Sequence, residues 1–126
     1  MRWCFKTSAT PYADSILQQL VAGSQAYAPA LWLYEVASVL AKGEKDNVIS
    51  ASDASDFIAD LAALDITVDP ESTDHVLTEV RRLAGTYGLT GYDAAYLELA
   101  LGKNLPLATL DDKLIKACNA MNHPLV

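Results

Sequence analysis

The chain has 126 residues, of which 52% are hydrophobic and 20% charged, so it can bury the core of one globular domain and is too apolar to be disordered. Its net charge of −7 argues against a protein that coats nucleic acid through Lys and Arg, although a bound divalent cation would change that count. No uncharged apolar run is long enough for a membrane span, and no signal peptide is recognisable, so we expect a cytoplasmic protein without a membrane segment. The cysteines, Cys4 and Cys118, lack metal-ligand spacing and indicate free thiols in a reducing compartment. The isolated His75 and His123 are expected at the surface or at helix ends rather than on zinc.

The first third of the chain predicts two helices and a strand. A helix over 12–22 is capped by Thr10-Pro11 and ended by Gly23. A short strand over 25–28 follows. The next helix, over 30–42, is strongly apolar, and we expect Gly43 to stop it.

The middle of the chain continues this alternation of helices and strands. An amphipathic helix over 50–64 is expected to start with a capping box of Ser50 and Asp53. Its acidic stripe of Asp53, Asp56 and Asp60 is expected to be a solvated face without chemistry. A strand over 65–69 comes next. A helix over 72–87, closed by Gly88, is predicted to turn four side chains inward: Val76, Leu77, Val80 and Leu83.

The last third contains the stretch around which the chain is organised, the almost wholly apolar helix over 89–101. We expect it to be buried on most of its circumference. A short apolar strand over 105–109 and a helix over 113–121 follow, and Leu125-Val126 is a candidate edge strand.

Glu35 is a lone acid in the apolar helix over 30–42, where it shares a face with Ser38. An ionised carboxylate loses its hydration when buried, so Glu35 needs a cation, a hydrogen-bond donor or solvent. A metal ion and a neighbouring Arg or Lys remain alternative partners.

Asp93 lies in the first turn of the organising helix, where the positive end of the helix dipole favours its ionised form. Thr90 and Asp93 also fit a capping box, in which each side chain would satisfy a backbone amide. Capping and chemistry therefore both remain open for Asp93.

Asp111 and Asp112 form a third acidic feature, just after a strand and at a helix start. Thr109 and Asp112 fit another capping box, so here too capping and a functional site are both open.

The alternation of strands and helices predicts an α/β layered fold on a mostly parallel sheet. Ligands of such sheets lie outside the carboxyl ends of the strands, where Glu35, Asp93 and Asp111 would converge. Three oxygen ligands with open positions suit Mg²⁺ or Mn²⁺.

Three segments together resemble PIN-domain proteins of the VapC-type ribonuclease toxin group: 27–37 (YAPALWLYEVA), 88–96 (GLTGYDAAY) and 105–111 (LPLATLD). The resemblance covers essentially the whole chain as one domain, residues 1–126. It implies a three-layer α/β/α sandwich with a cluster of acids that binds Mg²⁺ or Mn²⁺. The matching acids are Glu35, Asp93 and Asp111, with Thr109 as polar support and Asp112 as a less favoured substitute for Asp111.

The chain departs from the family pattern at its N-terminus. The family begins with an interior strand ending in a catalytic Asp, and no residue from Met1 to Thr10 replaces that carboxylate. We therefore hypothesise a truncated form with weakened metal affinity and impaired activity. Because the neighbouring strands would then have unpaired backbone groups, we expect a homodimer with a swapped or repacked N-terminal segment.

The resemblance implies a Mg²⁺-dependent endoribonuclease of a toxin–antitoxin system, which cleaves single-stranded RNA and binds a protein antitoxin. The candidate RNA contacts are Arg81, Arg82, Lys103, Lys113 and Lys116. The alternative is a non-catalytic PIN relic that only binds an antitoxin-like partner. A phosphoryl-transfer protein with an aspartyl nucleophile is a further rival, but it needs an Asp directly after the first strand, and none is present there.

Overall fold

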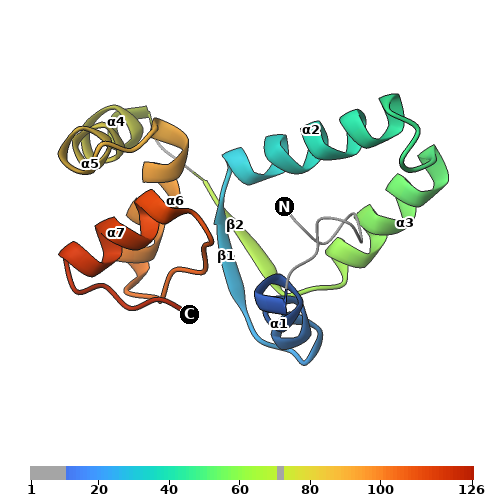
Figure 1. The fold of residues 1–126 in the computed structure, drawn as a ribbon, viewed down its shortest axis with the longest axis horizontal. Helices are drawn as coiled ribbons and strands as arrows, with labels where there is room; N and C mark the ends of the chain where they lie inside the picture. The colour runs from blue at the N-terminus through green and yellow to red at the C-terminus, as the bar shows by residue number, and fades with distance from the viewer. Residues whose placement is uncertain (1–10, 71–72) are drawn as a thin grey trace. The chain divides into compact units, whose positions relative to one another are not determined.

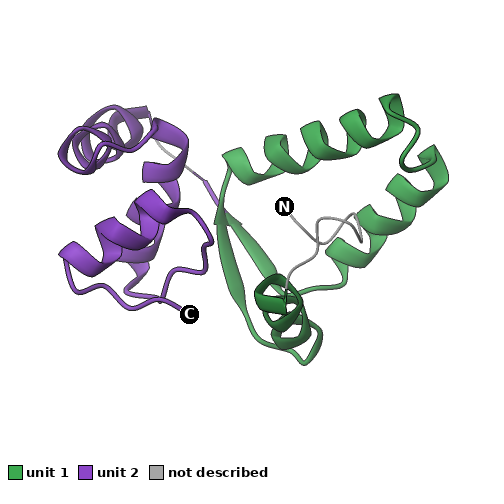
Figure 2. Cartoon of the chain, in the orientation of Figure 1, with its two compact units in different colours: residues 1–68 green, residues 69–126 purple. Residues whose placement is uncertain are grey.

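The structure is a computed structural model that describes residues 11–70 and 73–126. The chain divides into two compact units, residues 1–68 and 69–126 (Figure 2), and each is described by itself. The predictions for Met1 to Thr10 lie outside the described residues. These are the Thr10 cap, the Cys4 thiol and the repacked N-terminal segment of the truncation hypothesis.

From residue 11 onward, the first unit contains three helices and a parallel pair of strands (Figure 1): α1 (Pro11–Val21), β1 (Ala26–Pro29), α2 (Leu31–Lys45), α3 (Ala51–Ala62) and β2 (Ile66–Asp69). The last residue of β2, Asp69, opens the second unit. At the start of the sheet the Ala26 N–H donates to the Asp65 carbonyl over 2.9 Å. The predicted α/β class with a short parallel sheet is confirmed.

The start of α3 confirms the predicted capping box. The Ser50 hydroxyl accepts from the Asp53 N–H, and the Asp53 carboxylate accepts from the Ser50 N–H, each over 3.0 Å. The box satisfies two amides that have no partner within the helix.

The predicted stop of α2 at Gly43 is wrong. Gly43 is buried inside the helix, which continues to Lys45. The turn that ends it uses Asn47 (φ 56°) as its left-handed residue, and the Val48 N–H donates to the Gly43 carbonyl over 2.9 Å. Asn tolerates this conformation, so no glycine is needed at the end of the helix.

The core of the first unit joins α2 to α3. Val36 and Leu40 of α2 and Ala54 of α3 are buried together. Partly buried side chains complete this cluster: Trp32, Ile49, Phe57 and Leu61. The apolar faces of the two helices thus cover each other, as their periodicity requires.

The described residues of the second unit form helices joined by loops, with an isolated bridge near the C-terminus: α4 (Thr73–His75), η2 (Val76–Val80), α5 (Arg81–Tyr87), α6 (Gly91–Lys103) and α7 (Asp112–Ala120). The first three run without a break, as the single helix predicted over 72–87, but η2 is a π-helical turn. A π turn holds more residues than an α turn and shifts the side chains around the axis. Val80 and Leu83 are buried as predicted, whereas Leu77 is 60% exposed, so its predicted inward position is wrong.

Helix α6 is the most buried element of this unit. Leu97 is fully buried, and four further side chains of the helix are buried: Ala94, Ala95, Leu99 and Ala100. Cys118 of α7 is a buried free thiol, and burial raises its pKa. Within residues 11–70 and 73–126, no helix is both long and apolar enough to cross a membrane.

The predicted strand over 105–109 is wrong in its extent. Only Leu107 pairs, in an isolated parallel bridge with Leu125. The Leu107 N–H donates to the Pro124 carbonyl, and the Val126 N–H donates to the Leu107 carbonyl, each over 3.1 Å. Pro106, which has no N–H, limits how far this pairing extends.

Candidate functional site

Asp93 occupies the third position of α6, and its backbone and side chain have different roles. The Asp93 N–H donates to the Thr90 hydroxyl over 3.1 Å, so Thr90 caps the helix. The second half of a capping box would need the Asp93 carboxylate to accept from the Thr90 N–H. In the described part of the chain, this carboxylate has neither a hydrogen bond nor an ion pair. It is half-buried at the positive end of a buried helix and is not used as a cap.

Asp111 is the N-cap of α7. Its Oδ2 accepts from the Leu114 N–H over 2.9 Å, and its own N–H donates to the Thr109 hydroxyl over 3.0 Å. The alternative box of Thr109 with Asp112 is therefore not formed, because Thr109 is not the cap. The cap uses one carboxylate oxygen of Asp111 and leaves the other for a ligand.

Glu35 lies on α2, in the first unit, and its side chain is exposed. An apolar helix can carry this acid at little cost, because the exposed carboxylate stays in contact with water. Asp112, Lys113 and Lys116 are also exposed, in the first two turns of α7.

The predicted ligands are divided between the units, with Glu35 in the first and Asp93 and Asp111 in the second. Among the residues that the structure describes, no three His, Cys, Asp or Glu side chains form a group that could hold a metal ion. The donor chemistry nevertheless suits a hard cation, since all three side chains are carboxylates.

Two of the candidate RNA contacts are engaged within their own helix. The Arg82 guanidinium pairs with the Glu79 carboxylate over 3.0 Å, and the Arg81 Nε donates to the Leu77 carbonyl over 2.9 Å. Both side chains are exposed. A phosphate would therefore compete with exposed intrahelical contacts, which contribute little free energy.

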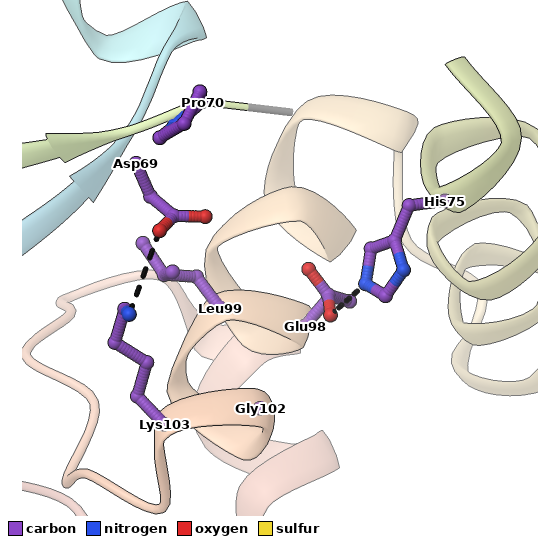
Figure 3. Close-up of a pocket in the computed structure, with 7 residues that line it drawn as sticks. All are labelled: Asp69, Pro70, His75, Glu98, Leu99, Gly102 and Lys103. Carbon is purple, nitrogen blue, oxygen red and sulfur yellow. Dashed lines mark hydrogen bonds and ion pairs between the residues drawn. The ribbon is translucent and has the colours of Figure 1, made fainter. Parts of the chain in front are cut away.

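Two ion pairs line a small pocket of the second unit, which has a volume of about 340 Å³ (Figure 3). His75 of α4 contacts the Glu98 carboxylate of α6 through Nε2. The Lys103 ammonium lies 3.5 Å from the Asp69 carboxylate. Pro70, Leu99 and Gly102 complete the lining.

The pocket was missed by sequence reasoning, which treated His75 as isolated and gave Glu98 no role. The expectation that His75 lies at the surface agrees with its half-exposed side chain. The hydrogen bond and charge of Glu98 raise the pKa of His75, with smaller contributions from the charges of Glu79 and Asp69. His75 and Glu98 lie 23 positions apart, so no local pattern could have paired them.

Comparison with known proteins assigns the chain to one family. The family model described as PIN domain matches residues 4–120, which takes in most of both units. The crystal structure of PAE2754 from Pyrobaculum aerophilum is similar to this chain, with a TM-score of 0.64 and 25% identity over 82% of this chain and 69% of that one. No curated protein matches the chain. The chain thus belongs to the PIN domain family, a family of nucleases.

Proposed function

We propose that this protein is a Mg²⁺- or Mn²⁺-dependent endoribonuclease of toxin–antitoxin type, which hydrolyses phosphodiester bonds of single-stranded RNA in the cytoplasm. The proposal starts from membership of a nuclease family. It treats the two units as parts of one catalytic domain. The remaining support comes from how individual acids are used.

The observation that carries the proposal is the state of the Asp93 carboxylate. The chain shows what a completed capping box is like at Ser50 and Asp53, where both reciprocal hydrogen bonds form. At Thr90 and Asp93 only the hydroxyl half forms, and no partner of the Asp93 carboxylate occurs among the described residues. Because the Asp93 carboxylate is not used as a cap, its oxygens are available to a cation.

We assign the ligand role to Glu35, Asp93 and Asp111. When bound, the cation would supply an activated water and charge stabilisation at the scissile phosphate. The chain's own contribution is to hold carboxylates: the Thr90 and Thr109 hydroxyls accept from the N–H groups of Asp93 and Asp111, which fixes both backbones. Asp112, one residue beyond Asp111, is a supporting acid in this assignment.

Exposed cations would contact the RNA backbone: Arg81, Arg82, Lys103, Lys113 and Lys116. Lys113 and Lys116 have the clearest claim, because both are exposed on the helix that Asp111 caps. Their positive charge would attract phosphates that the overall charge of −7 repels.

A protein antitoxin is the proposed partner, and we also propose a homodimer. A groove of about 560 Å³ in the first unit supports a protein partner. Side chains of α1 and α3 supply its apolar lining: Leu17, Leu20, Val21, Phe57 and Leu61. Asp60 and Asp65 also line it, so the groove suits an amphipathic helix with Lys or Arg beside its apolar face.

The test combines cation binding with cleavage of single-stranded RNA. Asp93→Asn should lower both Mn²⁺ affinity and cleavage rate by at least about tenfold, because the amide retains the shape and loses the charge. The matched control is Asp56→Asn, an exposed acid of α3 in the solvated stripe. Glu44→Gln, exposed on the same helix as Glu35, is the matched control for Glu35→Gln.

Cleavage that persists unchanged in both Glu35→Gln and Asp93→Asn would contradict the metal-nuclease proposal. If the wild-type chain binds neither cation and cleaves no RNA, but does bind an antitoxin-type helix, the non-catalytic alternative is the correct one.

A further inference from the structure

A side-chain pair links the residue before the π-helical turn η2 to α6. His75, the residue before Val76, contacts the Glu98 carboxylate across the pocket of Figure 3. Both partners and both elements belong to the second unit. Glu98 is the less exposed partner, with 19% of its side chain accessible against 49% for His75. Glu98 lies on α6, the helix with the most buried side chains in the unit, so His75 contacts a well-packed element.

The segment that follows His75 has an unusual helical geometry. π turns are rare, and in this one side chains bond to main-chain carbonyls. The Thr78 hydroxyl donates to the Asp74 carbonyl over 2.7 Å, and the Arg81 Nε donates to the Leu77 carbonyl over 2.9 Å. A threonine hydroxyl bonded to the carbonyl four residues back, as Thr78 is, slightly destabilises and often bends a helix. The contacts of η2 with α6 therefore matter for how this turn is held.

We propose that the His75–Glu98 ion pair is a pH-sensitive tie that anchors the start of the π-helical turn Val76–Val80 to α6. Only protonated His75 offers a positive charge to the Glu98 carboxylate, so the tie is strong when His75 is charged and weak when it is neutral. The proposal concerns the conformation of the second unit and goes beyond the proposed nuclease activity.

The charges that face His75 come from three elements. Glu98 of α6 makes the direct contact, Glu79 of η2 and Asp69 of β2 act at longer range, and all three favour protonated His75. Lys103 of α6 also lines the pocket and lies against Asp69. This arrangement raises the pKa of His75, so the tie is complete below pH 6.5 and is lost as the pH rises through the raised value.

The first test follows the titration of His75 by NMR in the full chain. In Glu98→Gln, which keeps the side-chain shape and removes the charge, the pKa of His75 should fall towards the ordinary histidine value of about 6.5. The matched control is Glu79→Gln, which removes a more distant charge and should lower the pKa of His75 by less.

The second test measures amide hydrogen exchange of residues 76–80 as protection factors, so that the intrinsic pH dependence is removed. In the wild-type chain protection should fall by about twofold to fivefold between about pH 6 and pH 9, as expected for loss of a half-exposed ion pair. In Glu98→Gln and in His75→Gln it should not change over this range. The amides of α7 serve as the reference helix.

Two results would overturn the proposal: the same His75 titration in the wild type and Glu98→Gln, or equal pH dependence of η2 protection in all three chains. His75→Gln keeps the test valid if Glu98→Gln fails to fold, because Glu98 is then intact. Neither measurement needs RNA or a metal ion. A negative result for the ion-pair proposal therefore leaves the nuclease proposal intact, and a negative result for the nuclease proposal leaves the ion-pair proposal intact.

Discussion

Substitutions at Asp111 can separate a structural role from a chemical one, because Asp111 is the N-cap of α7 and also a proposed metal ligand. Its Oδ2 accepts from the Leu114 N–H over 2.9 Å. Asn is as good an N-cap as Asp, whereas Ala removes the acceptor. Asp111→Asn therefore keeps the cap and deletes the charge, and Asp111→Ala deletes both.

The expected stabilities differ by the value of the cap. Loss of an N-cap costs about 1 kcal/mol, so Asp111→Ala should unfold a few degrees below Asp111→Asn in a chain of this size, by about 3–6 °C. Asp111→Asn itself should lose only the interaction of the charge with the helix dipole, about 0.3–1 kcal/mol. Thermal unfolding followed by circular dichroism measures both differences.

The activity of the same two variants tests the chemical role. If Asp111 is a ligand, both variants should lose RNA cleavage and Mn²⁺ affinity to a similar extent, although only one of them loses the cap. Equal destabilisation by Asn and Ala would refute the capping role. Wild-type cleavage by Asp111→Asn would refute the ligand role and leave Asp111 as a cap alone.

Three further predictions concern stability. Leu97→Ala, at a fully buried position of α6, should cost about 2–5 kcal/mol in chemical denaturation, and a loss below about 1 kcal/mol would show that α6 is not packed as described. Ser50→Ala should cost about 1 kcal/mol in the same assay, whereas Ser50→Asn should retain most of the stability because its side chain still caps α3; equal losses would contradict the capping box. The stability difference between the wild type and His75→Gln should be largest below pH 6.5 and should fade as the pH rises through the raised pKa of His75; a difference that grows with pH would contradict that sign.

Local signals in the sequence predicted most of the elements. The capping box of Ser50 and Asp53 is confirmed, and Gly88, with φ of 63°, ends α5 in the left-handed conformation that favours glycine. The buried helix after Thr90 is also confirmed: its middle turns are buried, as an almost wholly apolar run requires, while Tyr92 and Leu101 near its ends are exposed.

The errors arise where tertiary contacts outweigh local preference. Gly43 does not end α2, because Asn47 supplies the left-handed turn two residues after the helix ends. The π turn moves Leu77 outward, which no periodicity rule anticipates. Pairing of Leu107 is limited to one bridge with Leu125, although its apolar neighbours suggest a strand.

The candidate site was likewise predictable from the sequence only in part. The acids at helix starts were identifiable from Thr90, Thr109 and the residues that follow them, because capping positions are set by local sequence. Which of these acids caps its helix was not predictable. The Asp111 carboxylate caps α7, whereas the Asp93 carboxylate does not cap α6, and only the hydrogen-bond geometry distinguishes the two. The pair of His75 and Glu98 joins distant positions and became visible only once η2 was packed on α6.

In the proposed nuclease, acids distant in the sequence bind one hard cation. Substoichiometric Mn²⁺ added to the ¹⁵N-labelled chain provides a direct test, because the paramagnetic ion broadens the amide signals of nearby residues. We expect simultaneous broadening around Glu35, Asp93 and Asp111, reversed by excess Mg²⁺ and abolished in Asp93→Asn. Broadening confined to the exposed acidic stripe of α3, with residues 93 and 111 unaffected, would contradict it.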